Sequence, residues 1–249
     1  MPEVADQIYL SPHLDDVVLS CGGRIALQAR AGKRVLVVTV FAGRPEGALS
    51  PFALALHQRW RLPRDAPAVR RAEDRAARAR IGAAATHWDL PEAIYRRAPD
   101  GTPLYADETS LWGGLHPADG PLVETLACRI ADLPDNVPLY VPLGAGNHAD
   151  HRLVRRAAEA AGRPLFYYEE CPYAEDPQAV EVALTGGEWE PRLTFLDEQS
   201  LAAKIAAVAC YRSQLNTFWA DEEAMAERIR AYARRVGGGR PAERRWRRL

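Results

Sequence analysis

Short apolar runs and longer segments of helical period alternate along this chain. Residues 35–41 are apolar on both faces, which is typical of a central strand in a parallel sheet. The alternation predicts strands over residues 6–10, 35–41, 137–141 and 165–168, and helices over residues 17–30, 68–81, 122–133, 152–161, 197–215 and 221–235. This order of elements predicts an α/β fold: a Rossmann-like, mostly parallel sheet with helices on both faces.

Glycines and prolines interrupt the pattern in the first half of the chain. Residues 42–67 are long for a connection, which indicates a lid or a disordered loop, with a short amphipathic helix over residues 51–60. A short strand is expected over residues 86–91. Residues 92–117 show no clear period and are expected to form a loop, and no apolar run precedes the polar segment 116–119 at its end.

The second half of the chain has two further segments without helical period. Apolar and polar residues alternate over residues 180–184 and 192–195, which indicates a β-rich segment within 174–195. Three glycines at 237–239 precede a run rich in arginine. We therefore expect a single domain over residues 1–236 and a basic, flexible tail over residues 237–249.

Three polar side chains follow the first predicted strand. His13, Asp15 and Asp16 lie directly before the helix expected over 17–30. In an open α/β sheet, ligands bind at the carboxyl ends of the strands. His13 and Asp16 are three residues apart and can converge on a divalent metal, while Asp15 could face outward as a base. Crowding these groups is costly unless a cation or a reaction needs them, and a merely capped helix is the alternative.

A second corner of the same kind follows the strand expected over 137–141. It carries His148, Asp150 and His151 before the next helix. A catalytic zinc takes three protein ligands and leaves one position for water, and His13, Asp16 and one histidine of this pair supply that number. With Asp15 as base and His148 as acid, all the groups needed to hydrolyse an amide are present.

Other catalytic patterns are missing from the sequence. No serine or cysteine lies in a nucleophile elbow, which argues against acyl-enzyme chemistry. The glycine pair at 22–23 lacks the G-x-G-x-x-G spacing of dinucleotide-binding proteins. The corners are therefore the sites of chemistry that the sequence favours.

Composition narrows the class of protein further. The 249 residues carry a net charge of −1, so the whole chain has no overall attraction to nucleic acid or to a membrane surface. The first six residues lack the basic and apolar regions of a signal peptide, and the four cysteines have no CxxC spacing. We expect a cytoplasmic protein that acts on a small molecule, with no nucleic-acid or membrane partner; assembly into a homo-oligomer stays open.

The two corners resemble the motifs of a known family. Ser11-Pro12-His13-Leu14-Asp15-Asp16 resembles (A/S)-P-H-x-D-D, and His148-Ala149-Asp150-His151 resembles H-x-D-H. Both motifs belong to the zinc-dependent de-N-acetylases of the PIG-L/LmbE family. The resemblance spans most of the chain up to about residue 215.

This resemblance implies a function and roles for the corner residues. It implies one zinc ion per chain, or another divalent metal, bound by His13, Asp16 and His151. Asp15 would be the general base, and His148, oriented by Asp150, the acid and oxyanion stabiliser. Metal-activated water would then remove an N-acetyl group from an N-acyl amino sugar, an N-acetylglucosamine-type sugar or glycoconjugate.

Arg70, near the start of the helix over 68–81, is the candidate substrate-binding residue. Its guanidinium could reach sugar hydroxyls or a phosphate, or could instead pair with Glu73 or Asp74 on a solvated face. Two other classes of function stay open. One is a sugar- or nucleotide-binding module without hydrolytic activity, and the other is an interaction protein that acts through its basic tail.

Overall fold

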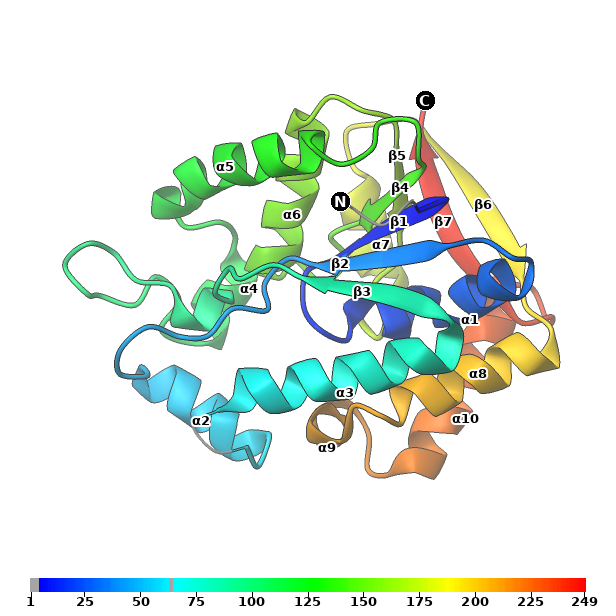
Figure 1. The fold of residues 1–249 in the computed structure, drawn as a ribbon, viewed down its shortest axis with the longest axis horizontal. Helices are drawn as coiled ribbons and strands as arrows, with labels where there is room; N and C mark the ends of the chain where they lie inside the picture. The colour runs from blue at the N-terminus through cyan, green and yellow to red at the C-terminus, as the bar shows by residue number, and fades with distance from the viewer. Residues whose placement is uncertain (1–4, 63–64) are drawn as a thin grey trace.

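The four apolar runs at residues 6–10, 35–41, 137–141 and 165–168 form four neighbouring strands at the centre of the sheet. In the computed structural model, which describes residues 5–62 and 65–249, seven strands form one sheet in the order β3-β2-β1-β4-β5-β7-β6 (Figure 1). The first five are parallel, and β7 is antiparallel to β5 and β6. The strands are β1 (Gln7–Ser11), β2 (Val35–Thr39), β3 (Ala83–His87), β4 (Leu139–Pro142), β5 (Leu165–Tyr168), β6 (Trp189–Phe195) and β7 (Ala242–Arg248). The predicted α/β fold with a mostly parallel sheet is confirmed.

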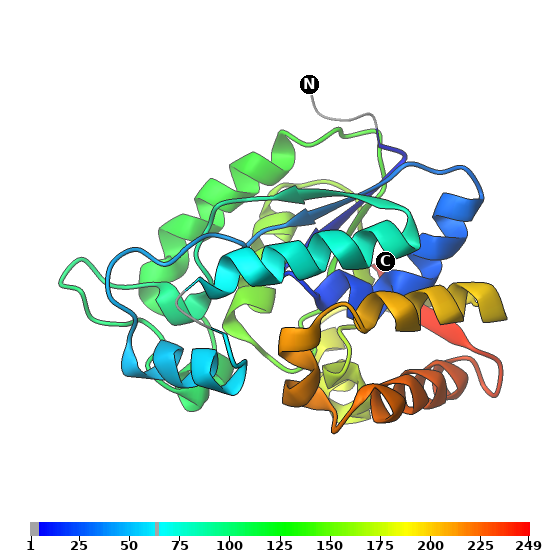
Figure 2. The ribbon, with the colours of Figure 1, turned by 60° about the horizontal axis from the view of Figure 1, so that its bottom comes forward.

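Helices cover both faces of the sheet, because side chains of each strand alternate between the faces. Tyr9 of β1 packs with one helical layer, and its neighbours Ile8 and Leu10 pack with the other. The first layer is α1 (Asp16–Arg30), α3 (Ala66–Ile81), α8 (Glu198–Val208) and α10 (Glu222–Val236), which lie in front of the sheet in Figure 2. The second layer is α5 (Gly120–Ala131), α6 (Ala149–Ala160) and α7 (Pro177–Leu184).

A smaller apolar cluster lies beside the sheet, at the end from which the loops after β1 and β2 emerge (Figure 1). It packs α2 (Pro51–Arg59) and α4 (Glu108–Gly113) against Ala149, the first residue of α6. The helix expected over 51–60 is thus confirmed, whereas the segment 92–117 is not all loop. Aromatic and aliphatic side chains of the segment (Ile94, Tyr95, Leu104, Tyr105 and Leu111) supply the burial that stabilises α4.

The expected β-structure over 180–184 is wrong, because these residues belong to α7. Asp176 caps this helix by accepting a hydrogen bond from the Gln178 N–H, and a proline follows at the first helical position. Val180 is buried whereas Val182 is 64% exposed, so the apolar residues follow a helical period and not an alternating one. The helix expected over 197–215 is also divided, into α8 and α9 (Arg212–Phe218).

The expected flexible tail is also wrong, because residues 242–248 form β7 inside the sheet. Glu243 is buried, and its two carboxylate oxygens accept hydrogen bonds from the backbone N–H groups of Gly23 and Arg24 in α1. The ammonium of Lys204 in α8 donates to the same carboxylate over 2.8 Å. Arg244 and Trp246 both donate to Glu169. Ion pairs and hydrogen bonds with distant residues, Glu169 and Lys204 among them, therefore stabilise this basic segment as a strand.

Two of the sequence-based predictions include residues that the structure does not describe. The prediction about a signal peptide includes residues 1–4, and the prediction of a lid or loop over 42–67 includes residues 63–64. Within the described residues, no helix has the length and apolar content needed to cross a bilayer.

Candidate metal centre

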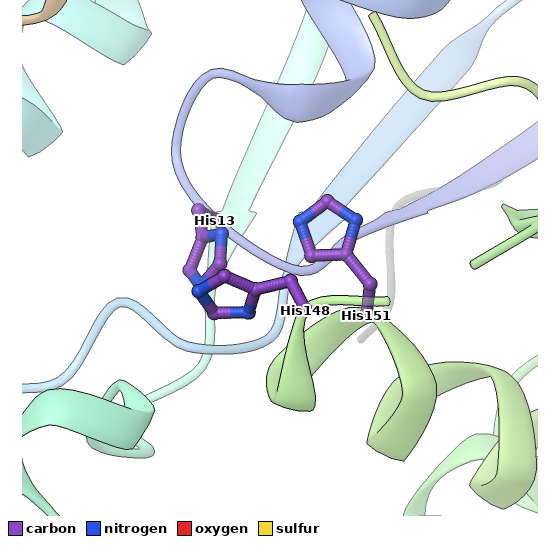
Figure 3. Close-up of side chains that lie close together, drawn as sticks. All are labelled: His13, His148 and His151. Atoms are coloured by element: carbon purple, nitrogen blue, oxygen red, sulfur yellow. The ribbon is translucent and has the colours of Figure 1, made fainter. Parts of the chain in front are cut away.

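The two polar corners meet where the strand order reverses. β1 and β4 are neighbours in the sheet, and β1 connects toward β2 on one side while β4 is followed by β5 on the other. His13 lies in the loop after β1, and His148 and His151 lie at the start of α6. Figure 3 shows their three rings gathered together. The site therefore lies at the topological switch point of the sheet, the usual ligand position in open α/β folds.

Ser11 shapes the first corner. Its hydroxyl donates to the backbone carbonyl of His13 over 2.5 Å and accepts from the N–H of Val17 over 3.1 Å. The backbone N–H of His13 in turn donates to Asp16 Oδ2 over 2.7 Å. These bonds turn the chain sharply between strand and helix, which brings the side chains of His13 and Asp16 to the same side.

Two histidine nitrogens lie close to one carboxylate oxygen at the spacing of tetrahedral metal ligands. Asp16 Oδ2 lies 3.2 Å from His13 Nδ1 and 3.3 Å from His151 Nε2. Zinc–ligand bonds of about 2.0–2.1 Å with tetrahedral angles place ligand atoms about 3.3–3.4 Å apart. Donor atoms of His13, His148 and His151 also lie within 4.8 Å of one another, so these histidines form a group that could hold a metal ion.

The second nitrogen of each of two rings is held by a carboxylate. His13 Nε2 lies 3.0 Å from Asp150 Oδ2, and His151 Nδ1 lies 3.2 Å from Glu170 Oε1. A carboxylate accepts only, so in the neutral form of each ring the proton lies on this nitrogen, and the other nitrogen, which faces Asp16 Oδ2, carries the lone pair. His151 Nε2 is buried and makes no hydrogen bond of good geometry in the described part of the chain, although Asp16 Oδ2 lies 3.3 Å away. A nitrogen that faces a carboxylate oxygen without a well-aligned hydrogen bond fits a metal ion between the two.

The electrostatics of the corner favour a cation. Burial acts to lower the pKa of His151, but the carboxylates of Asp16 and Glu170 outweigh it and raise the pKa to about 9. Burial opposes protonation of His13 in the same way, and Asp16 and Asp150 raise the pKa of His13 well above its usual value. Both imidazoles therefore lie in a negative field, which a divalent cation would neutralise.

His148 is held in a different way from the other two histidines. Its Nδ1 accepts a hydrogen bond of 3.1 Å from the backbone N–H of Asp150, so the neutral ring carries its proton on Nε2. The expected orientation of His148 by Asp150 thus involves the amide of Asp150, and the carboxylate of Asp150 bonds His13 instead. Burial and the nearby ring of His13 hold the pKa of His148 well below its usual value.

Asp15 is buried at the N-terminus of α1 without capping it. Its side chain makes no hydrogen bond to the backbone of the helix, although it occupies the N-cap position. Burial and the neighbouring Asp16 raise the pKa of Asp15 to about 6, and the positive charge of Arg70 opposes this rise. The alternative of a merely capped helix is therefore wrong for Asp15.

Arg70 does not lie on a solvated face, contrary to one of the two expectations for it. It is 4% exposed, donates to Glu92 over 2.5 Å and lies 4.8 Å from the ring centre of Trp60. Glu73 bonds Ser213 instead, and Asp74 pairs with Arg78. Arg70 is therefore held inside the molecule, near Asp15.

The sequence did not predict a role in the site for three residues, Glu92, Arg96 and Glu170. Glu170 holds His151 and also accepts from the N–H groups of Gly144 and Ala145, at the turn that leads to His148. Its position directly after the strand over 165–168 was an available signal, because that strand ends at the same sheet edge. Glu92 and Arg96 lie in a segment without period, and no local signal marks them.

Comparison with known proteins agrees with this geometry. A 2'-N-acetylparomamine deacetylase of Streptomyces fradiae is 31% identical over a match that covers 96% of this chain and 80% of that protein. A 2'-N-acetylparomamine deacetylase of Niallia circulans is 29% identical over 86% of this chain and 82% of that protein. The crystal structure of the zinc-inhibited form of the teicoplanin deacetylase Orf2 has 30% sequence identity and a TM-score of 0.85, and the match covers 98% and 97% of the two chains.

Family assignment follows from the segment that contains both corners. Residues 8–162 match the family PIG-L, described as GlcNAc-PI de-N-acetylase. This match covers more than half of the 249 residues and includes His13, Asp16, His148 and His151. The chain belongs to the PIG-L family of de-N-acetylases.

Proposed function

We propose that this protein is a zinc-dependent hydrolase that removes the N-acetyl group from an amino sugar carried by a larger glycosylated molecule. Its relatives act, by name, on N-acetylparomamine and on teicoplanin, which supports a glycoconjugate substrate over a free sugar. The observation that carries the proposal is that Asp16 Oδ2 lies at the spacing of tetrahedral zinc ligands from both His13 Nδ1 and the buried His151 Nε2.

We assign the metal to His13, Asp16 and His151. Two imidazoles and one carboxylate form a donor set that suits zinc, and the carboxylates behind the two rings fix their orientation. Zinc at this position would supply Lewis acidity, which lowers the pKa of water to about 7 and polarises a carbonyl oxygen.

Asp15 is the proposed general base. It is buried beside the ligand Asp16, and it is free of the capping bond that would otherwise occupy it. Its raised pKa of about 6 makes it a better proton acceptor than an ordinary aspartate near neutral pH. The same carboxyl group, once protonated, can return the proton to the leaving amine nitrogen.

The hydrogen bonding of His148 supports its role as oxyanion stabiliser. General acid catalysis by a histidine starts from the cation, which needs a proton on Nδ1, but Nδ1 already accepts from the Asp150 amide. The neutral ring keeps an Nε2–H donor beside the metal ligands. This donor can bond the acetyl oxygen as negative charge develops there.

Aromatic side chains border the histidines and suit a sugar ring. Trp112 lies edge-on to His148 with ring centres 5.0 Å apart, and Tyr173 lies edge-on to Trp112 and to His151 at 5.2 and 5.7 Å. Sugar sites commonly combine such apolar rings with a few fixed polar groups. We propose Arg70 as one of these polar groups, since its buried Nε has no hydrogen-bond partner among the described residues.

The test is acetate release by zinc-loaded protein. The substrates are 2'-N-acetylparomamine, a glycopeptide that carries N-acetylglucosamine, and free N-acetylglucosamine, with the Asp15→Asn variant as control. We expect release from at least one glycoconjugate, and release at least about 10²-fold slower by the variant. A fully zinc-loaded protein that binds these compounds yet releases no acetate would instead support the sugar-binding module.

A further inference from the structure

A buried carboxylate lies behind the metal centre, in the polar segment 116–119. Asp119 is 2% exposed and accepts hydrogen bonds from Arg96 over 2.8 Å and from the Tyr105 hydroxyl over 2.6 Å. A buried charge is costly unless it is paired, so these donors are part of what keeps Asp119 inside. The pattern of segment 116–119 gave no role for this residue.

Arg96 joins Asp119 to the metal centre. One amino group of its guanidinium donates to Asp119 Oδ2, and the other donates to Asp150 Oδ1 over 2.5 Å. The guanidinium lies 5.2 Å from the ring centre of Phe41 and 5.3 Å from that of Tyr105. Arg96 itself is 6% exposed, so its position is fixed by two carboxylates and two aromatic rings.

Asp150 is thereby held in one orientation. Its Oδ1 accepts from Arg96, and its Oδ2 accepts from the backbone N–H of Ala93 over 2.8 Å and from His13 Nε2 over 3.0 Å. Because Oδ2 faces Nε2, the proton of the neutral His13 ring lies on Nε2 and the lone pair lies on Nδ1. A rotated Asp150 would allow the other tautomer, whose Nδ1 cannot bind a metal.

We propose that Arg96 is a positioning residue, held by its hydrogen bond to Asp119 and its contact with the ring of Tyr105. By fixing the orientation of Asp150, Arg96 keeps the lone pair of His13 on Nδ1, where it can bind the metal. This proposal rests on the metal site of the proposed function. The chain of contacts runs from Asp119 through Arg96 and Asp150 to His13. Among the described residues, the side chain of Arg96 donates to Pro91, Asp119 and Asp150 and not to His13, Asp16 or His151, so its effect should appear in metal affinity before it appears in chemistry.

The test compares Arg96→Lys with a matched variant, Arg78→Lys. Arg78 is also buried and also pairs with an aspartate, Asp74, but its side chain extends from α3 to the backbone of β2, where it donates to the carbonyl of Val37. Lysine keeps the charge in both and loses the planar fork. We expect the zinc dissociation constant of Arg96→Lys, measured by competition with a chromophoric chelator, to rise about 10–100-fold. We expect Arg78→Lys to lower the unfolding temperature and leave zinc binding within about twofold of wild type.

A second measurement reads the tautomer directly in zinc-free protein. At a pH above the raised pKa of His13, where its ring is neutral, the ¹⁵N shifts of His13 should show a proton on Nε2 in the wild type and in Arg78→Lys, and a mixture of tautomers in Arg96→Lys. Should Arg96→Lys fail to fold, Tyr105→Phe keeps Arg96 and removes one donor to Asp119, together with the acceptor of the His116 N–H, and zinc binding should weaken by several fold. Unchanged zinc affinity and an unchanged tautomer in a folded variant would overturn the proposal.

The failure of this inference differs from failure of the proposed function. A wild-type protein that binds no zinc would refute the metal site itself. A wild-type protein that binds zinc and releases acetate, together with Arg96→Lys that binds zinc equally well, would refute only the role of Arg96.

Discussion

Helix α1 has buried charge at two places, and the two differ in how well the charges are matched. At its middle, the carboxylate of Glu243 meets the ammonium of Lys204 and two backbone N–H groups, one negative against one positive side chain. At its N-terminus lies the site cluster, in which six buried carboxylates accompany two arginines. Its members are Asp15, Asp16, Glu92, Asp119, Asp150, Glu170, Arg70 and Arg96.

This difference separates a structural ion pair from a functional one. The pair of Lys204 and Glu243 satisfies its own hydrogen bonds and ties β7 and α8 to α1. The site cluster contains four more carboxylates than guanidinium groups, and this excess of carboxylates raises the pKa of both His13 and His151. Such an excess is unfavourable in a buried place without a cation. Unmatched charge, more than burial of charge as such, is what marks the site.

The largest expected effect comes from removing a metal ligand of the site cluster. Asp16→Ala and His151→Ala each leave two of the three donors, so we expect bound zinc to fall close to zero and acetate release to fall to background. Elemental analysis of purified protein gives the zinc content, with Lys204→Met as the control that should keep it. Full zinc occupancy in both ligand variants would contradict the assigned set.

Asp15→Asn should separate the base from the ligands beside it. The amide cannot take a proton from water, so we expect kcat to fall about 10²–10⁴-fold while the zinc content stays at the wild-type value. Steady-state acetate release and elemental analysis on the same sample provide both readouts. A near-normal rate would show that another group is the base.

Lys204→Met probes the matched pair at the middle of α1. It leaves Glu243 buried without its counter-charge, and we expect the free energy of unfolding to drop by about 3–5 kcal/mol, measured by urea denaturation. The kcat and zinc content of the folded variant should stay unchanged. The double variant Lys204→Met, Glu243→Gln should regain part of the lost stability. A loss of zinc in either variant would show that the pair of Lys204 and Glu243 is coupled to the site cluster, against the distinction between the two places.

His148→Ala tests whether this histidine is a donor to the acetyl oxygen. We expect kcat to fall about 10²–10³-fold, the range for loss of one oxyanion donor, with zinc content unchanged. His148→Gln keeps an N–H donor and should retain more activity than the alanine variant. If His148→Ala instead loses its zinc, His148 is a metal ligand and the assignment of the three histidines must change.

The sequence predicted the parts of this site that lie on strand ends. His13, Asp15 and Asp16 follow β1, and the second corner follows β4, so two apolar strands and their parallel pairing suffice to bring them together. The order of the central elements was predictable for the same reason. Hydrophobic period is a local property, and these strands are buried on both faces.

The remainder depends on contacts between distant segments. Two charged residues of β7 find their partners far away in the chain, since Arg244 pairs with Glu169 across 75 residues and Glu243 pairs with Lys204 across 39. Arg96 emerges from a segment without period, and its role depends on Asp119 and Asp150, 23 and 54 residues away. No local pattern encodes such pairs, so the outer part of the site required the structure.

Arg70 lies at the boundary between matched and unmatched charge, and its expected effect is the smallest. It pairs with Glu92, as a structural arginine would, yet it faces Asp15 and has a buried Nε without a partner in the described residues.

The variant that tests Arg70 is Arg70→Lys, because removing the charge would leave Glu92 buried alone. If Arg70 contacts the substrate, the lost hydrogen bond should lower kcat/KM, mainly through a raised KM. The fall should correspond to a loss of transition-state stabilisation of about 1.5–3 kcal/mol, with zinc content unchanged. The matched control is Arg71→Lys, since Arg71 adjoins it in α3 but bonds Ala42 and the exposed Asp89. Michaelis constants that are equal in Arg70→Lys, Arg71→Lys and the wild type would assign Arg70 to the structural pair with Glu92 alone.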